Sequence, residues 1–404
     1  MTGPLPRRGI RADNVRWAAV CLVLACYLFV PSSMAQGMTF SVFDVKIFAP
    51  EVLLLVAFAG GKIHNTRLAL WAIVGIAYGL LNTLVVDAPS VTSAISSVLE
   101  LYLPILIGAF LPSRRFSEGL PPVFVAVGLV GLSLEVLLYS TGILQYHTPI
   151  GQKISGEFVR ISTTAGAATA TGVFLFILTV LFCELWLKKG WIIGIGAALG
   201  VAATVATLSR GPILMVCATG VLVAFGLLAG RPRRIRAGAV VALIAVSAWA
   251  VQASGADEAL VARGGDNFLE SEAREERADE ALGVIAKKPF WGVGYGQYWE
   301  RPRYSSGRIT VGGTSPHNMY LLQMAEGGIV GLLVFVGGAA WLVRRSLGKF
   351  RVSLIPAGLI AIMAIGMNTE VLYCLAEAGL ALCCLVAAGD AAQEHGREEG
   401  VRWR

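Results

Sequence analysis

The feature that most constrains this chain is a series of apolar stretches, each long enough to cross the roughly 30 Å hydrocarbon core of a bilayer. We predict such spans at 17–35, 41–60, 68–86, 95–111, 120–140, 165–187, 191–208, 212–229, 237–253, 318–343, 353–369 and 370–388. Hydrophobic residues make up 56% of the chain and charged residues only 15%, well below the quarter that is usual in soluble domains. The sequence therefore predicts an all-α polytopic membrane protein of about twelve transmembrane helices and excludes a soluble globule.

The domain organisation follows from the same pattern. Residues 1–404 are predicted to form a single membrane domain, with one large extramembrane loop at 254–316. The first apolar stretch is either a retained span or a cleaved signal peptide, since a basic segment precedes it and Ser33-Met34-Ala35 resembles a cleavage site. Either outcome leaves the sidedness of the later spans unchanged.

The charge distribution predicts the orientation. The net charge is +7, but most Lys and Arg residues cluster in alternate short loops, as cytoplasmic loops do. The short loops on the other side contain only Lys46, Lys153, Arg160 and Arg210. Both termini are thus predicted to be cytoplasmic and the loop at 254–316 periplasmic. The positive charge is explained by topology, and no nucleic-acid partner is expected.

The cysteines point to packing and not to metal or disulfide chemistry. All seven fall inside apolar stretches, and none lies in the large polar loop. Their spacing matches no metal-binding pattern. We interpret them as small buried hydrophobic residues, and no metal or cofactor is expected.

The large loop contains an expected amphipathic helix. Ala278, Ala281, Leu282 and Ile285 recur at helical spacing, and the pattern ends at Lys288-Pro289. Its apolar face is expected to rest on the bundle or on the membrane surface.

A run of aromatic residues and glycines follows this helix at 290–299. Gly292, Gly294 and Gly296 alternate with other residues there and are expected to let the backbone turn tightly. The aromatic residues favour the membrane interface and are expected to stack on sugars or to cover a cavity. The glycine spacing is not a dinucleotide fingerprint, because no strand precedes it and no helix opens from it.

Polar residues on the predicted outer side are candidates for chemistry: Arg160, Arg210, Arg274 and His317. An arginine at a helix end often only reaches toward lipid phosphates, and that alternative stands for Arg160 and Arg274. Arg210 is harder to explain in this way, because its short outer turn gains nothing structurally from a positive charge. Its planar, permanently charged group is suited to binding a phosphate or diphosphate through two hydrogen bonds.

His317 is predicted to lie in the first turn of the span at 318–343. Ser315 is expected to cap this helix and Pro316 to occupy its first position. The positive helix end would keep the imidazole neutral and able to accept a proton, and it would also favour an anion nearby. The alternative is a histidine with only a capping or interfacial role.

Residues 316–332, with the sequence PHNMYLLQMAEGGIVGL, resemble the signature of the bacterial O-antigen ligase and O-antigen polymerase superfamily. Two further segments match in order, and the resemblance covers roughly residues 150–345. These segments are Ser209-Arg210-Gly211, and Arg274 followed by Ala281-Leu282, Ile285, Pro289 and the glycine run at 292–296. The lysine that the family contributes from its N-terminal third has no clear counterpart, and Lys46 is the nearest candidate.

The resemblance implies a fold of the glycosyltransferase C type, located in the bacterial inner membrane with its active site at the periplasmic face. It implies transfer of a glycan from undecaprenyl diphosphate to a hydroxyl acceptor, with inversion and without a metal or a nucleotide sugar. His317, Arg210 and Arg274 would be catalytic, and Arg160, Asn318 and Tyr320 would help the arginines to bind substrate. The acceptor would be lipid A core for a ligase or a second glycan for a polymerase.

The ligase and polymerase readings both stay open, and the compact chain with short outer loops slightly favours the ligase. A transporter or lipid flippase is the rival of another class, because it also needs many spans and buried cations. Such proteins tend to place polar features at the bilayer midplane in both of two repeats. The sequence shows no internal repeat, and its notable polar residues are predicted at one face.

Overall fold

The structure, a computed structural model, describes residues 7–29, 61–112, 120–141, 168–186, 190–227, 275–298, 318–347 and 353–367, with short strands and single positions between them. Its elements, in chain order, are α1 (Arg7–Phe29), β1 (Thr39–Val42), β2 (Val45–Phe48), α4 (Thr66–Val85), α5 (Val91–Ala109), α6 (Leu120–Ser140), β3 (Ile154–Ser155), β4 (Phe158–Val159), α7 (Ala168–Leu185), α8 (Gly190–Ala206), α9 (Arg210–Leu227), β5 (Pro302–Ser305), β6 (Arg308–Val311), α12 (Met319–Leu347), α13 (Ile355–Ala361) and the π-helix η2 (Ile362–Gly366). A further helix spans 275–287.

The predicted helical membrane fold is confirmed in outline. Among the described residues, α4, α5, α6 and α12 are the helices long and apolar enough to cross a membrane, by length and composition. Shorter apolar helices lie at the predicted spans that correspond to α1, α7, α8, α9 and α13. The predicted spans at 237–253 and 370–388 lie outside the described residues, apart from Cys384 and Val386.

In the part of the chain that the structure describes, three short antiparallel hairpins depart from the all-α prediction. The first pairs β1 with β2, with Val42 opposite Val45, and occupies the start of the segment predicted as a span at 41–60. That prediction is wrong over its first residues, where alternating polar and apolar residues such as Ser41 and Lys46 fit a two-residue repeat better than an apolar helix. The third hairpin, β5 with β6, lies within the loop at 254–316.

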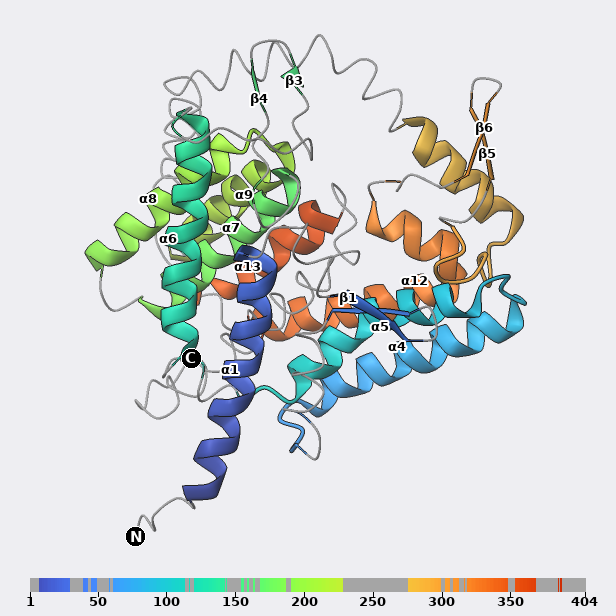
Figure 1. The fold of residues 1–404 in the computed structure, drawn as a ribbon, viewed down its shortest axis with the longest axis horizontal. Coiled ribbons are helices and arrows are strands. Elements are labelled where there is room, and N and C mark those ends of the chain that lie inside the picture. The colour runs from blue at the N-terminus through green and yellow to red at the C-terminus, as the bar shows by residue number, and fades with distance from the viewer. Residues whose placement is uncertain are drawn as a thin grey trace.

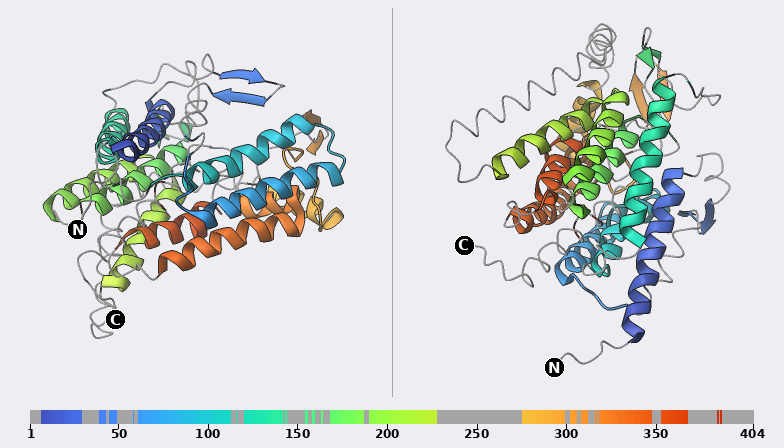
Figure 2. Two further views of the ribbon diagram at one scale, coloured as in Figure 1. Left: turned by 90° about the horizontal axis from the view of Figure 1, so that it is seen from below. Right: turned by 90° about the vertical axis from the view of Figure 1, so that its left-hand side faces the viewer.

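The helices form two groups that cross in Figure 1. In one group, α4, α5 and the later part of α12 run side by side, as both views of Figure 2 also show. In the other, α1 packs on α6, and α6 packs on α7 and α8, with α9 and α13 beyond α7. α1 and α6 run steeply across the direction of α4 and α5 (Figure 1).

Side-chain caps and glycines explain the α4–α5 pair. The Asn65 side chain accepts a hydrogen bond from Leu68 N at 3.1 Å, and Ser90 caps α5 in the same way at Ser93 N. Between the helices, Gly75 faces the Tyr102 ring so closely that a Cβ would lie 2.2 Å from it. Small residues at such positions let membrane helices approach one another closely.

Contacts between helix ends agree with the predicted alternation of sides. Arg345 Nη1 reaches Asn65 Oδ1 at 3.4 Å, and Leu354 N donates to Glu184 Oε2 at 2.8 Å. Each pair joins ends predicted to be cytoplasmic. At the opposite ends, Gln297 of the long loop bonds to the α4–α5 turn at Ser90.

Candidate functional site

The centre of the candidate site is a break in α12. Gly328 has φ 63° and ψ −167°, and a Cβ there would lie 2.1 Å from Phe290 O. The Tyr320 and Phe335 ring centroids lie only 6.0 Å apart, whereas a continuous helix would separate these positions by about 22 Å. Residues 319–327, the first arm, therefore fold back beside residues 329–347, the second arm. The prediction of one unbroken span at 318–343 is wrong.

The glycine loop, residues 289–298, satisfies the backbone groups that this break exposes. Val293 N donates to Ala325 O and Gly294 N to Glu326 O, both at 2.9 Å. On the other side of the break, Ile329 N donates to Pro289 O at 2.8 Å. Broken helices inside a bilayer need such replacement partners, because water is not available to supply them.

The glycines of this loop have the tight-turn role that the sequence predicts. Gly292, Gly294 and Gly296 have φ values of 67°, 100° and 69°. At Gly292 a Cβ would lie 2.4 Å from Glu326 O, so no larger residue fits between the loop and the first arm.

The aromatic residues of the loop do not share one environment. Tyr295 and Tyr298 are buried, at 1% and 2% exposure, so the expectation that the whole aromatic run faces sugars or the interface is wrong. Phe290 is 69% exposed and Trp291 38% exposed. Only these two aromatic side chains of the described loop are available to a ligand or to lipid; Trp299 lies outside the described residues.

A polar cluster lies where the loop, α4, α5 and α12 meet. The Tyr78 hydroxyl donates to Gly327 O, and the Tyr295 hydroxyl donates to Gln323 Oε1 at 3.3 Å. Burial raises the pKa of Tyr295 well above its usual value, and the nearby Tyr102 and Tyr78 raise it further. Tyr295 therefore stays a neutral hydrogen-bond donor across the physiological pH range.

Glu326 is the acidic member of this cluster. Its side chain is fully buried, and neither carboxylate oxygen makes a hydrogen bond of normal geometry. The backbone N–H groups of Gly296 and Tyr298 are its nearest polar neighbours. A buried carboxyl group in an apolar helix is costly, which makes its placement in this motif notable.

The first arm begins later than predicted. The Asn318 side chain accepts hydrogen bonds from Tyr320 N at 2.9 Å and Leu321 N at 3.0 Å, so Asn318 is the N-cap of α12. The expectation that Ser315 caps the helix and that His317 lies in its first turn is wrong, because the asparagine amide oxygen fits this cap directly. His317 precedes the cap and itself lies outside the described residues.

Tyr320 joins the first arm to η2. Its hydroxyl donates to Met363 O at 2.5 Å, within a π-helical turn where the regular backbone ladder is widened. α13 and η2 in turn pack against α9, which begins at Arg210. The structure thus connects the Asn318 end of α12 with the helix that carries Arg210.

Arg210 is exposed at the first position of α9, after a strained turn. Leu208 has a φ of 51°, which a bulky side chain rarely adopts, and Ser209 is buried with its hydroxyl 3.2 Å from Thr169 Oγ1. A cation at a helix N-terminus also opposes the helix dipole. Local structure therefore gives no reason for an arginine at this position.

The remaining predicted site residues, Arg160 and Arg274, lie outside the described residues. The helix at 275–287 begins directly after Arg274. Ala281, Val284 and Ile285 form its buried face, whereas Leu282 is 49% exposed and does not belong to the face predicted for it. Lys46, the candidate for the family's lysine, lies in β2.

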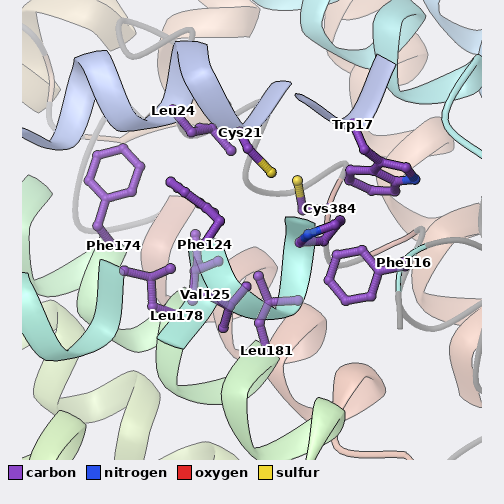
Figure 3. Close-up of a pocket in the computed structure, with 12 residues that line it drawn as sticks. Trp17, Cys21, Leu24, Phe116, Phe124, Val125, Phe174, Leu178, Leu181 and Cys384 are labelled. Atoms are coloured by element: carbon purple, nitrogen blue, oxygen red, sulfur yellow. The ribbon is translucent and has the colours of Figure 1, made fainter. Parts of the chain in front are cut away.

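A small described pocket lies elsewhere, between α1, α6 and α7. Figure 3 shows Trp17, Phe116 and Phe174 around it, with the Cys21 and Cys384 sulfurs facing its interior. Both cysteines are buried, as the sequence predicts for small hydrophobic residues. Its lining is apolar and contains none of the predicted site residues.

The sequence reasoning missed the break and the buried acid. The signals were present: consecutive glycines at 327–328 within a helical pattern, and Glu326 in an otherwise apolar run.

A search of curated proteins gave no match. Residues 195–336 match the family described as O-antigen ligase. This segment begins in α8 and includes Arg210, the glycine loop, Asn318 and the break in α12. This match supports the resemblance of the chain to the superfamily of O-antigen ligases and polymerases.

Proposed function

We propose that this protein is a membrane glycosyltransferase that moves a glycan from undecaprenyl diphosphate to a hydroxyl acceptor at the periplasmic face of the inner membrane. Enzymes of this family act on glycans. The observation that carries the proposal is the broken α12 inside the matched domain, because the first arm begins at Asn318, directly after His317. Discontinuous helices place their ends inside a membrane protein where substrates bind.

In the proposed reaction, an acceptor oxygen attacks the anomeric carbon while the bond from that carbon to the diphosphate oxygen breaks. The configuration at the anomeric carbon inverts, and undecaprenyl diphosphate leaves. His317 takes the proton from the acceptor hydroxyl, as a general base within hydrogen-bond reach. The positive end of the first arm, next to this residue, favours the neutral imidazole that a base needs.

Arg210, with Arg274 and Arg160, is proposed to bind the diphosphate and to stabilise its charge as the bond breaks. The support for Arg210 is structural. It follows Leu208 at a φ of 51° and opens α9 against the helix dipole, and neither feature improves stability. Asn318 and Tyr320, predicted as substrate contacts, already use their side chains for the cap and for Met363 O. We therefore assign them to positioning.

A ligase acting on lipid A core is the first candidate, and a polymerase of repeat units is the second. Both need the same donor, so the acceptor decides between them. Purified protein in detergent, incubated with a labelled lipid-linked glycan, should transfer the label to lipid A core. Label appearing only on a second lipid-linked glycan would establish the polymerase. Absence of any transfer product, with donor movement across reconstituted vesicles, would instead support a transporter.

A further inference from the structure

We propose that Tyr295 is a positioning residue, a buried wedge that sets the angle between the two arms of α12. The angle in turn fixes where Asn318 and the adjoining His317 lie. This inference rests on the proposed function, since it concerns the group that acts in that reaction. Tyr295 itself contacts neither the acceptor nor the donor in this proposal.

The Tyr295 hydroxyl lies in the corner between the arms. A Cβ on Gly327, at the end of the first arm, would lie 2.8 Å from it, and a Cβ on Gly331, in the second arm, 2.9 Å. The same hydroxyl donates to Gln323 Oε1, one turn back along the first arm. With 1% exposure, the side chain has no room to move aside.

Neighbouring contacts hold the wedge in place. The Tyr78 ring meets the Tyr295 ring edge to face at 6.4 Å, and the Tyr78 hydroxyl donates to Gly327 O. The backbone of the loop is bonded to both arms through Val293, Gly294 and Pro289. Tyr295 is therefore fixed to α4 and to the loop, while its hydroxyl separates the arms.

The consequence for the site is geometric. The first arm is a short rigid helix whose outer end, at Gly327, is held against the loop. A change in the angle at this end is magnified at its other end, where Asn318 caps the helix. A misplacement of about 1 Å at a reacting group is enough to cost on the order of a hundredfold in rate.

A compensating pair of substitutions tests the wedge. Gly331→Ala adds a methyl group that meets the Tyr295 oxygen, so we expect kcat to fall by on the order of ten- to a hundredfold with little change in the donor KM. Adding Tyr295→Phe removes that oxygen and should restore most of kcat. Gly337→Ala on the same arm meets no atom within 4 Å and should leave kcat unchanged. Tyr295→Phe alone removes the oxygen between the arms and should lower kcat, and Gly337→Ala should not restore it.

A distance measurement reports the angle without any need for activity. In a background without native cysteines, spin labels are attached at Met324→Cys and Leu333→Cys. Double electron–electron resonance then measures the distance between the two arms. We expect the distance to shift in Gly331→Ala and to return in the double variant. An unchanged distance, or a kcat that Tyr295→Phe fails to rescue, would overturn the wedge. A wild-type protein with the expected distances but no transfer would overturn the proposed function alone.

Discussion

The two groups of helices differ in what fills the space between them. Between α1, α6 and α7 lies a pocket with an apolar lining that includes Trp17, Phe174 and Leu178. Between α4, α5 and α12 lie Glu326 and Gln323, together with buried tyrosines. Polar groups are expensive in apolar helices, so the second group keeps them where a break in α12 needs hydrogen bonds and a defined shape. We infer that the apolar interior of the first group mainly stabilises the fold, and that the polar interior of the second positions the first arm of α12.

The largest expected effect is at the break itself. Gly328→Ala requires a glycine-type backbone conformation that costs about 1–3 kcal/mol and places a methyl group 2.1 Å from Phe290 O. We expect the protein to lose its folded form in detergent, measured as a loss of the monodisperse peak on size-exclusion chromatography. Gly337→Ala is the control on the same helix and should elute normally. A normal peak for both variants would show that the protein does not need a glycine at the break in α12 to fold.

The second prediction concerns a core residue of the group formed by α1, α6 and α7, where we expect a loss of stability without a loss of catalysis. Leu175 is fully buried in α7, and Leu175→Ala should lower the free energy of unfolding by about 2–5 kcal/mol through the lost contacts and the cavity. The rate of transfer per folded molecule should stay unchanged. Leu84→Ala, at a side chain 77% exposed, is the control and should alter neither quantity. A loss of rate at Leu175 without a loss of stability would contradict the division between the two groups.

Substitutions of Arg210 should lower the transfer rate without lowering stability, the reverse of what we expect for Leu175→Ala. Arg210→Lys replaces a two-point donor with a point charge, so we expect a loss of about a hundredfold or more in transfer rate. The thermal unfolding temperature should stay the same or rise slightly with Arg210→Ala, because the cation opposes the dipole of α9. Full polysaccharide display in cells that carry Arg210→Ala at normal expression would reduce this residue to a lipid-phosphate contact.

The smallest of these effects concerns the contact between the glycine loop and the α4–α5 turn. Gln297 Nε2 donates to Ser90 O at 2.7 Å, and its Oε1 accepts from Ser90 N at 3.3 Å. Gln297→Ala leaves both backbone groups without these partners and should cost about 1–3 kcal/mol of stability. Gln297→Glu keeps the acceptor but turns an oxygen toward Ser90 O, so it should cost at least as much. A fully stable Gln297→Glu protein would show that this contact does not hold the loop.

Sequence reasoning predicted the membrane helices well where the signal is local. The apolar lengths of α4, α5 and α6, and the amphipathic helix before Pro289, follow from composition and period alone. The break at Gly328 does not, because glycine is tolerated in membrane helices and only the approach of Phe290 forbids a side chain. The N-cap of α12 is predicted at the wrong residue for a similar reason. Ser315 and Asn318 are both good N-cap residues, and only tertiary packing determines which of them caps the helix.

The candidate site was predictable as a set of residues but not as an arrangement. Arg210 stood out because short outer loops avoid positive charge, and its exposed position at the start of α9 agrees with that reasoning. Tyr320 was predicted as a substrate contact, yet its hydroxyl bonds Met363, some forty residues away in η2. A long-range partner of this kind leaves no pattern in a single sequence.

In the proposed mechanism, the residue that precedes the broken helix is the base for glycan transfer. Its most direct measurement is the transfer rate of purified His317→Asn beside His317→Ala, with donor binding measured separately. Because Asn318 caps α12, replacing His317 removes no cap, and an asparagine at 317 is not needed as a substitute cap. We expect both variants to bind the lipid-linked donor and to lose transfer by on the order of a hundredfold or more. A His317→Asn protein that transfers glycan at the wild-type rate would contradict the assignment of this residue as the base.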